Sequence, residues 1–204
     1  MVTGSRANER LVLQAADSAY RELAALAEPG MRRWCRANAW SYSLEPLTGA
    51  AHPYVERYAL IRRLLESYRY VFWLDLDVVP VTLDDIVYDP SADFHFSVDY
   101  NGWCAGAALY RAGSWSRWLI GMLLRLPAAL PHRLAEQDEL KALLRLEAVK
   151  PHVRPFSELQ IANPVSRLDG HTPTMFHAWA NGSYVLAKEQ VRDRVNSFLA
   201  ACPE

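Results

Sequence analysis

The pattern of hydrophobic and polar positions predicts strands and helices that alternate along the first half of the chain. Residues 11–16 form an apolar run typical of a strand, and Asp17 and Ser18 follow it as good helix caps. A helix is predicted from there to residues 28–30, where Pro29 and Gly30 indicate its end. This order is typical of the start of an α/β protein.

A second helix is predicted to begin at Pro53, because proline is tolerated in a first helical turn. Apolar residues then recur every three or four positions, at Tyr54, Tyr58, Ile61, Leu65 and Tyr68. Further strands are predicted at residues 94–98, 107–110 and 175–178, and further helices at residues 116–126, 135–146 and 189–200. The pattern favours one α/β domain, residues 1–204, with a mostly parallel central sheet flanked by helices, which would bind its ligand beyond the carboxyl ends of the strands.

The apolar run at residues 71–80 is interrupted by two carboxylates, Asp75 and Asp77. In an extended strand these two side chains would point to the same face, with Leu76 turned back into the core. Two like charges at the end of a buried strand are costly unless a cation or a proton compensates them. A divalent metal is the simplest compensation, and a turn with solvated carboxylates is the structural alternative.

Composition narrows the possible partners and the location. The chain has 204 residues and a formal net charge of -1, so it has no general attraction for nucleic acid or anionic lipid. Its three cysteines form no C-x-x-C pair, and neither a signal peptide nor an apolar stretch of membrane-spanning length is visible. We expect a cytoplasmic protein with no membrane segment in this chain and no nucleic-acid partner.

Two enzyme chemistries use such an acid pair. One is transfer from a sugar nucleotide whose diphosphate is held by a metal; the other is an aspartyl phosphatase of the haloacid dehalogenase type, with Asp75 as nucleophile and Asp77 as acid and base. Those phosphatases carry the pair on their first strand and need a later Gly-Asp element. Here a complete strand and two helices precede the pair, and no Gly-Asp dipeptide occurs. The transferase is the favoured alternative.

The segment from Tyr68 to Asp77 resembles the metal-binding D-x-D strand of GT-A fold glycosyltransferases. It is most similar to the galactosyl-, mannosyl- and xylosyltransferases typified by fungal alpha-galactosyltransferases and plant xyloglucan xylosyltransferases. The resemblance extends over residues 11–181. It implies transfer of a sugar from a nucleotide diphosphate sugar, above all a UDP-sugar, to a carbohydrate or other hydroxyl acceptor with retention of configuration. A non-catalytic binding domain on the same scaffold is a third alternative.

The same resemblance implies where the nucleotide sugar binds. The loop after the first strand would contribute Ala15, Ala16, Asp17 and Tyr20, although Asp17 can equally be a simple helix cap. Arg57 stands where the family has a lysine that reaches the diphosphate, with a solvated surface arginine as the alternative. Asp75 and the neighbouring Leu76 would also contact the donor.

Residues 101–111 resemble the family's N-x-G segment, which lines the donor-sugar pocket. With Gly106 as the glycine of this motif, Cys104 replaces the expected asparagine, so that Asn101 or Asp99 would supply the polar contact. A tight turn at Gly102 and Gly106 is the structural alternative.

Three further segments resemble catalytic or metal-binding parts of the family. Glu136, Gln137 and Asp138 match the acidic-Gln element beside the reacting carbon, although acids also favour a helix start; Gln160–Asn163 matches a Q-x-x-N segment. His177 matches the late histidine that completes the metal site, with His171 as the fallback. Two carboxylates and an imidazole suit Mn²⁺ or Mg²⁺. Trp103 and Trp179 are expected to form an acceptor platform.

Overall fold

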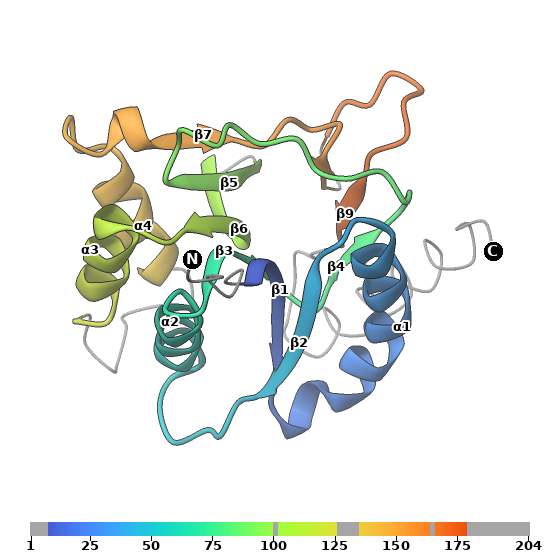
Figure 1. Cartoon of the computed structure of the whole chain (residues 1–204), viewed down its shortest axis with the longest axis horizontal. Coiled ribbons are helices and arrows are strands. Elements are labelled where there is room, and N and C mark those ends of the chain that lie inside the picture. The colour runs from blue at the N-terminus through green and yellow to red at the C-terminus, as the bar shows by residue number, and fades with distance from the viewer. Residues whose placement is uncertain (1–7, 100–101, 126–134, 164–165, 179–204) are drawn as a thin grey trace, which may run out of the picture.

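A six-stranded mixed sheet runs through the centre of the molecule (Figure 1). The computed structural model describes residues 8–99, 102–125, 135–163 and 166–178. In spatial order the strands are β2 (Ser41–Pro46), β1 (Asn8–Ala16), β3 (Tyr68–Leu74), β6 (Gly102–Arg111), β5 (Phe94–Asp99) and β7 (Val153–Pro155). Only β6 is antiparallel to its neighbours in this sheet, so the predicted α/β fold with a mostly parallel sheet is confirmed.

Helices cover both faces of this sheet (Figure 1). One face packs against α2 (Pro53–Leu64), α3 (Ser114–Leu123) and α4 (Ala135–Leu144). The other packs against α1 (Arg21–Ala37) and a small sheet of β4 (Val78–Pro80), β9 (Met175–His177) and β8 (Ile161–Ala162). Two short 3-10 helices, η1 (Ser18–Tyr20) and η2 (Lys150–His152), complete the described elements. No helix among the described residues is both long and apolar enough to cross a membrane.

The predicted end of the first helix is wrong. α1 continues through Pro29 to Ala37, because Met31, Trp34 and Cys35 prolong its buried apolar stripe. That burial outweighs the backbone hydrogen bond that a proline within a helix removes. The edge strand β2 was not predicted, since it mixes polar, apolar and charged residues and ends in a proline.

The predicted strand across residues 71–80 is also wrong in its middle. β3 ends at Leu74, and Asp75, Leu76 and Asp77 form a turn in which the Val78 N–H donates to the Asp75 carbonyl over 2.9 Å. The chain then leaves the central sheet and joins the small sheet as β4. The two carboxylates therefore converge through this turn, and not through the pleat of one strand. Tyr68, expected in the second helix, begins β3.

Five strands of the central sheet end at the same edge, because β1, β2, β3, β5 and β7 all run in the same direction. Each remaining predicted strand overlaps an observed one, in β5, β6 and β9, and the helices predicted from residues 116 and 135 correspond to α3 and α4. The predicted helix at residues 189–200 lies outside the described residues. The carboxyl edge of the sheet, where the Asp75 turn follows β3, is where the chemistry expected from the sequence gathers.

Candidate metal and nucleotide-sugar site

Three candidate metal ligands meet at the carboxyl edge of β3. Asp75 and Asp77 come from the turn between β3 and β4, and His177 ends β9, which pairs with β4. One ligand atom from each residue lies within 4.8 Å of the other two, and His177 Nε2 is 3.3 Å from Asp77 Oδ1. The Ala178 N–H donates to the Asp77 carbonyl over 2.8 Å and ties the two segments together. The structure thus brings together the three predicted ligands, whereas the fallback His171 is an exposed residue outside the group.

Gly106 makes room for this group. A Cβ added to Gly106 would lie 2.4 Å from His177 Cε1, 2.8 Å from His177 Nε2 and 3.0 Å from Asp75 Oδ2. Such distances are shorter than a carbon contact allows, so any larger residue would push the imidazole or the carboxylate away. Gly106 lies within β6 and not in a tight turn; only Gly102, with φ of 97°, has the left-handed backbone that favours glycine there.

Neighbouring side chains orient the ligands. The Trp73 indole N–H donates to Asp75 Oδ1 over 2.7 Å, and the buried Gln14 amide donates to the Asp75 carbonyl over 3.2 Å. Cys104 Sγ lies 3.9 Å from His177 Nδ1, so this thiol contacts the ring nitrogen that faces away from Asp77. Second-layer contacts of this kind fix the rotamers of metal ligands. Trp73 and Gln14 were not predicted as site residues from the sequence, although a glutamine in the otherwise apolar first strand was a visible signal.

The electrostatics of the group favour a bound cation. The pKa of Asp75 is raised, because partial burial and the charge of Asp77 together outweigh the attraction of Arg57. Burial by itself would lower the pKa of His177, but Asp77 and Cys104 hold that pKa well above its ordinary value. Oxygen ligands from two carboxylates and one imidazole nitrogen match the preferences of Mn²⁺ and Mg²⁺. The residues present therefore fit the predicted metal.

Arg57 joins the metal group to α4. Its guanidinium contacts the Glu136 carboxylate and, at 3.1 Å, the Tyr58 hydroxyl; Nη1 lies 3.9 Å from Asp75 Oδ1. The Tyr58 hydroxyl also donates to Glu136. Only 11% of the Arg57 side chain and 12% of the Glu136 side chain are exposed, so the alternative of a solvated surface arginine is wrong. Arg57 and Glu136 form a nearly buried ion pair beside Asp75.

The other two predicted catalytic residues, Gln137 and Asp138, do not share the ion pair of Glu136 with Arg57. Gln137 is half-buried, and Asp138 is exposed on α4 with Lys141 Nζ 3.7 Å from its Oδ1. Of the three predicted residues, Glu136 is the one that the structure links to Asp75, through Arg57.

A cavity of about 640 Å³ opens beside the ends of β1 and β2; we call it the β1–β2 cavity. Its lining includes the predicted residues Ala16 and Asp17, together with Arg21 of α1 and residues 44–49, which the sequence analysis did not identify. Asp17 Oδ1 accepts hydrogen bonds from the Ala19 and Tyr20 N–H groups, so the predicted cap is present as well. Ala15 is buried near the end of β1, next in sequence to Ala16, and is not part of the cavity lining.

The remaining predicted residues are spread around the sheet edge. Leu76 is buried within the acidic turn, and Asp99 ends β5. The Gln160 amide donates to the Val87 carbonyl, and the Asn163 amide to the Val98 carbonyl, so both side chains of the Q-x-x-N segment bind backbone. Asn101 and Trp179 lie outside the described residues.

Comparisons with known proteins identify the fold. Neither a protein-family model nor a curated protein matches the chain. Among solved structures it is similar to a glycosyltransferase involved in glycosylating the major capsid of PBCV-1, with 12% identity, a TM-score of 0.69 and coverage of 93% of this chain and 99% of that one.

Two further structures have the same fold. The glycosyltransferase GlyE of Streptococcus pneumoniae is 14% identical with a TM-score of 0.55, over 95% of this chain and 64% of GlyE. A Drosophila β1,4-galactosyltransferase 7 mutant, solved with manganese, UDP-Gal and xylobiose, is 15% identical with a TM-score of 0.54, over 90% of this chain and 79% of that one. The chain therefore has the fold of the GT-A glycosyltransferases, whereas the comparisons do not test the fungal and plant subgroup.

Proposed function

We propose that this protein is a metal-dependent glycosyltransferase that moves a sugar from a nucleotide diphosphate sugar, a UDP-sugar above all, to an acceptor hydroxyl. The observation that carries the proposal is the group of Asp75, Asp77 and His177 at the end of β3, within 4.8 Å of one another on a GT-A fold. The galactosyltransferase structure that contains manganese and UDP-Gal supports the choice of metal and donor by analogy. Retention of configuration rests on the sequence resemblance.

Each residue of the site has a role in this proposal. Asp75, Asp77 and His177 would hold Mn²⁺ or Mg²⁺, which when bound supplies Lewis-acid neutralisation of the departing diphosphate. Arg57 adds a permanent positive charge beside Asp75 and is positioned by Glu136. The β1–β2 cavity lies on the same carboxyl edge of the sheet and would take the nucleoside.

We expect the thermal stability of the protein to depend on UDP only when both a metal and Asp77 are present. Saturation at ~100 times the dissociation constant adds about 2.7 kcal/mol, which raises Tm by roughly five to ten degrees for a chain of this length. The shift should appear with UDP and Mn²⁺, and should vanish with EDTA or in Asp77→Asn. His171→Gln, an exposed histidine outside the group, is the matched control and should keep the full shift.

Each outcome of this experiment separates the proposed function from its alternatives. Absence of a shift with every nucleoside diphosphate and metal would overturn the transferase, and phosphate release abolished by Asp75→Asn would then indicate the phosphatase. A shift without sugar transfer or donor hydrolysis, across a panel of donor sugars, would indicate a non-catalytic binding domain.

Metal binding should strengthen as the pH rises. The raised pKa of His177 means that the folded protein favours the protonated imidazole. This protonation contributes to folding stability in full below pH 6.5, the ordinary pKa of histidine, and the contribution is lost as the pH rises through the pKa of the folded state. A metal needs the neutral imidazole and must displace this proton. We expect Mn²⁺ affinity to rise by up to about tenfold per pH unit while His177 is protonated. Calorimetric titrations in buffers of different ionisation enthalpy should detect the released proton, and His177→Gln should abolish its release; a pH-independent affinity would contradict this assignment.

A further inference from the structure

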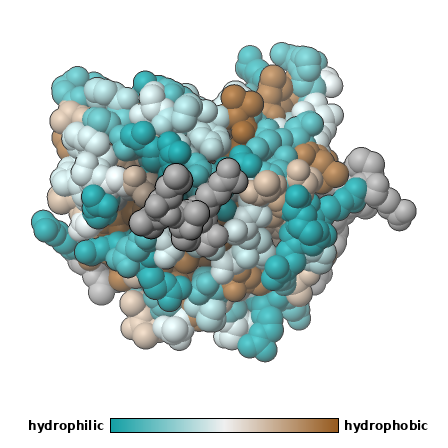
Figure 2. All heavy atoms as spheres, viewed as in Figure 1, coloured by the Kyte–Doolittle hydropathy of each residue, from teal (hydrophilic) through white to brown (hydrophobic). Residues whose placement is uncertain are grey.

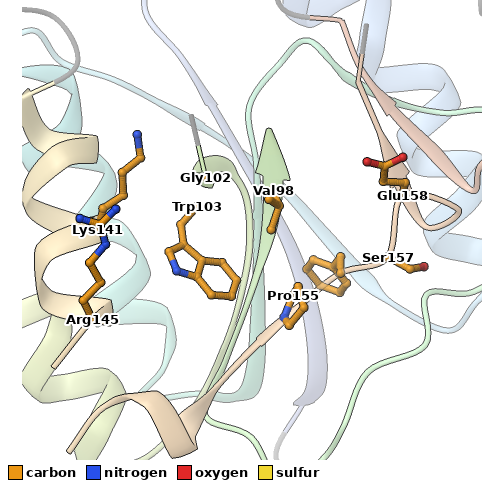
Figure 3. A pocket seen from close by; sticks show the side chains of 9 residues that line it. Val98, Gly102, Trp103, Lys141, Arg145, Pro155, Ser157 and Glu158 are labelled. Atoms are coloured by element: carbon orange, nitrogen blue, oxygen red, sulfur yellow. The ribbon is translucent and has the colours of Figure 1, made fainter. Parts of the chain in front are cut away.

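A second cavity, of about 590 Å³, lies on the carboxyl edge of the sheet beyond the metal group; we call it the Trp103 cavity (Figure 3). It is lined by Val98, Gly102, Trp103, Lys141, Arg145, Pro155, Phe156, Ser157 and Glu158. Figure 3 shows Lys141 of α4 and Arg145, which directly follows α4, on one side of the Trp103 ring, and Pro155 with the following segment on the other. The cavity is thus walled by a helix, a strand start and the segment after β7.

The sheet order places the metal group between two cavities. The β1–β2 cavity lies at the ends of β2 and β1, and the metal group lies at the end of β3 beside Gly106 of β6. The Trp103 cavity lies at the end of β5, the start of β6 and the end of β7. A donor whose nucleoside fills the first cavity and whose diphosphate reaches Asp75 leaves the second one for the other substrate.

The floor of the Trp103 cavity suits the face of a sugar ring. Trp103 is half-buried and rests on Phe96, with ring centroids 6.3 Å apart. Pro155 and Phe156 continue the apolar surface beside it. Aromatic rings provide large, rigid contact area for the apolar face of a pyranose. Glu158 adds a carboxylate on the opposite wall that can accept hydrogen bonds from hydroxyls, and its Oε2 also accepts from the Arg167 N–H over 3.0 Å.

The helix wall of the cavity carries two cations with little compensation. The Lys141 side chain is only 11% exposed, and its Nζ has one anionic neighbour among the described residues, Asp138 Oδ1 at 3.7 Å. Arg145 is exposed and forms no ion pair within the described part of the chain. Two cations on the same side of the cavity, one on α4 with a buried stem and one just after this helix, provide charge-assisted donors for an anion.

We propose that the Trp103 cavity binds the acceptor, and that this acceptor is a saccharide bearing an anionic group, either a carboxylate or a phosphate ester. The inference rests on the proposed function. Glu136 at the start of α4 contacts Arg57, whereas Lys141 follows five residues later, about 7.5 Å further along the helix axis, and Arg145 follows the far end of the helix. The anion would therefore bind at a distance from the donor diphosphate, on a part of the acceptor remote from the reacting hydroxyl.

Ligand-observed NMR titrations test this assignment with three probes: methyl β-D-glucuronide, glucose 6-phosphate and the neutral methyl β-D-glucoside. We expect at least one anionic probe to bind more tightly than the neutral one. Whichever of the two anionic probes binds more tightly shows whether the acceptor carries a carboxylate or a phosphate ester. The double variant Lys141→Gln with Arg145→Gln should lower the affinity for the anionic probes by roughly tenfold and leave the affinity for the neutral probe unchanged. Trp103→Leu should weaken all three. Arg117→Gln, an exposed arginine on α3, is the matched control and should change none of them.

Where the probes do bind, two results would overturn the proposal. One is equal binding of anionic and neutral probes; the other is a loss of the UDP and Mn²⁺ thermal shift in the Lys141 and Arg145 variant, which would assign these cations to the donor. The thermal shift also separates the two proposals. If the shift persists in the wild type while no anionic probe binds, the acceptor assignment fails and the transferase stands; if no nucleoside diphosphate with any metal gives a shift, the transferase fails whatever the probes do.

Discussion

Replacing Gly106 by alanine is expected to abolish metal binding at the Asp75 group. The new methyl would lie 2.4 Å from His177 Cε1 and 3.0 Å from Asp75 Oδ2, so the imidazole must move away from its position beside Asp77. Disturbing a residue that only orients ligands costs about 10–100-fold in metal affinity, and displacement of a ligand should exceed that loss. Mn²⁺ titration followed by paramagnetic water relaxation measures it directly.

Gly121→Ala is the matched control for this substitution. Gly121 lies in α3 with nothing within 4 Å of an added Cβ, so alanine there should preserve metal binding and stabilise the helix by about 0.5–1 kcal/mol. If Gly106→Ala retained wild-type affinity for Mn²⁺, His177 would not be a ligand in the position that the structure gives it.

Removing the Arg57 charge should destabilise the protein strongly. Arg57→Met would leave the Glu136 carboxylate, 12% exposed, with the Tyr58 hydroxyl but without its cation. Breaking a buried pair from one side costs about 3–5 kcal/mol, because the remaining charge is desolvated and uncompensated. Urea unfolding of Arg57→Met against the wild type measures the cost.

The double variant Arg57→Met with Glu136→Gln separates pairing from packing. Since it removes both charges, it should recover a large part of the stability that Arg57→Met loses, giving a coupling energy of about 0.5–3 kcal/mol. Arg62→Met on the exposed side of α2 is the control and should change stability by less than about 0.5 kcal/mol. Additive losses in the double variant would show that the ion pair is not the stabilising unit.

The face of the molecule shown in Figure 2 gives little independent guidance to function. The face in Figure 2 mixes hydrophilic and hydrophobic residues, and its brown residues form separate patches without one continuous apolar surface. Of the exposed large hydrophobic residues of the described chain, Val98 lies in β5 and lines the Trp103 cavity, and the others, Leu83, Val87, Leu146 and Leu159, lie on loops. The candidate chemistry therefore lies at the carboxyl edge of the sheet, which only the strand order reveals.

The sequence by itself was sufficient for the fold class and for the residues of the candidate metal-binding group. The alternation of apolar strands and helices with 3.6-residue spacing is local information, and it predicted β1, β5, α2 and α4 in the right order. Asp75 and Asp77 were detectable because charged residues are rare in buried runs. His177 was identified by resemblance to the family, because a separation of a hundred residues from Asp77 does not indicate that the two side chains are close in space.

Only the tertiary structure decided how these residues meet. Whether Asp75 and Asp77 lie in a strand or a turn depends on β4 leaving the central sheet to pair with β9, a contact between segments about a hundred residues apart. The need for glycine at position 106 arises from the imidazole that β9 brings against it. The burial of Arg57 requires α4 to supply Glu136. Local sequence patterns do not encode such long-range contacts, because packing between distant elements outweighs the small local propensities and decides which side chains share a volume.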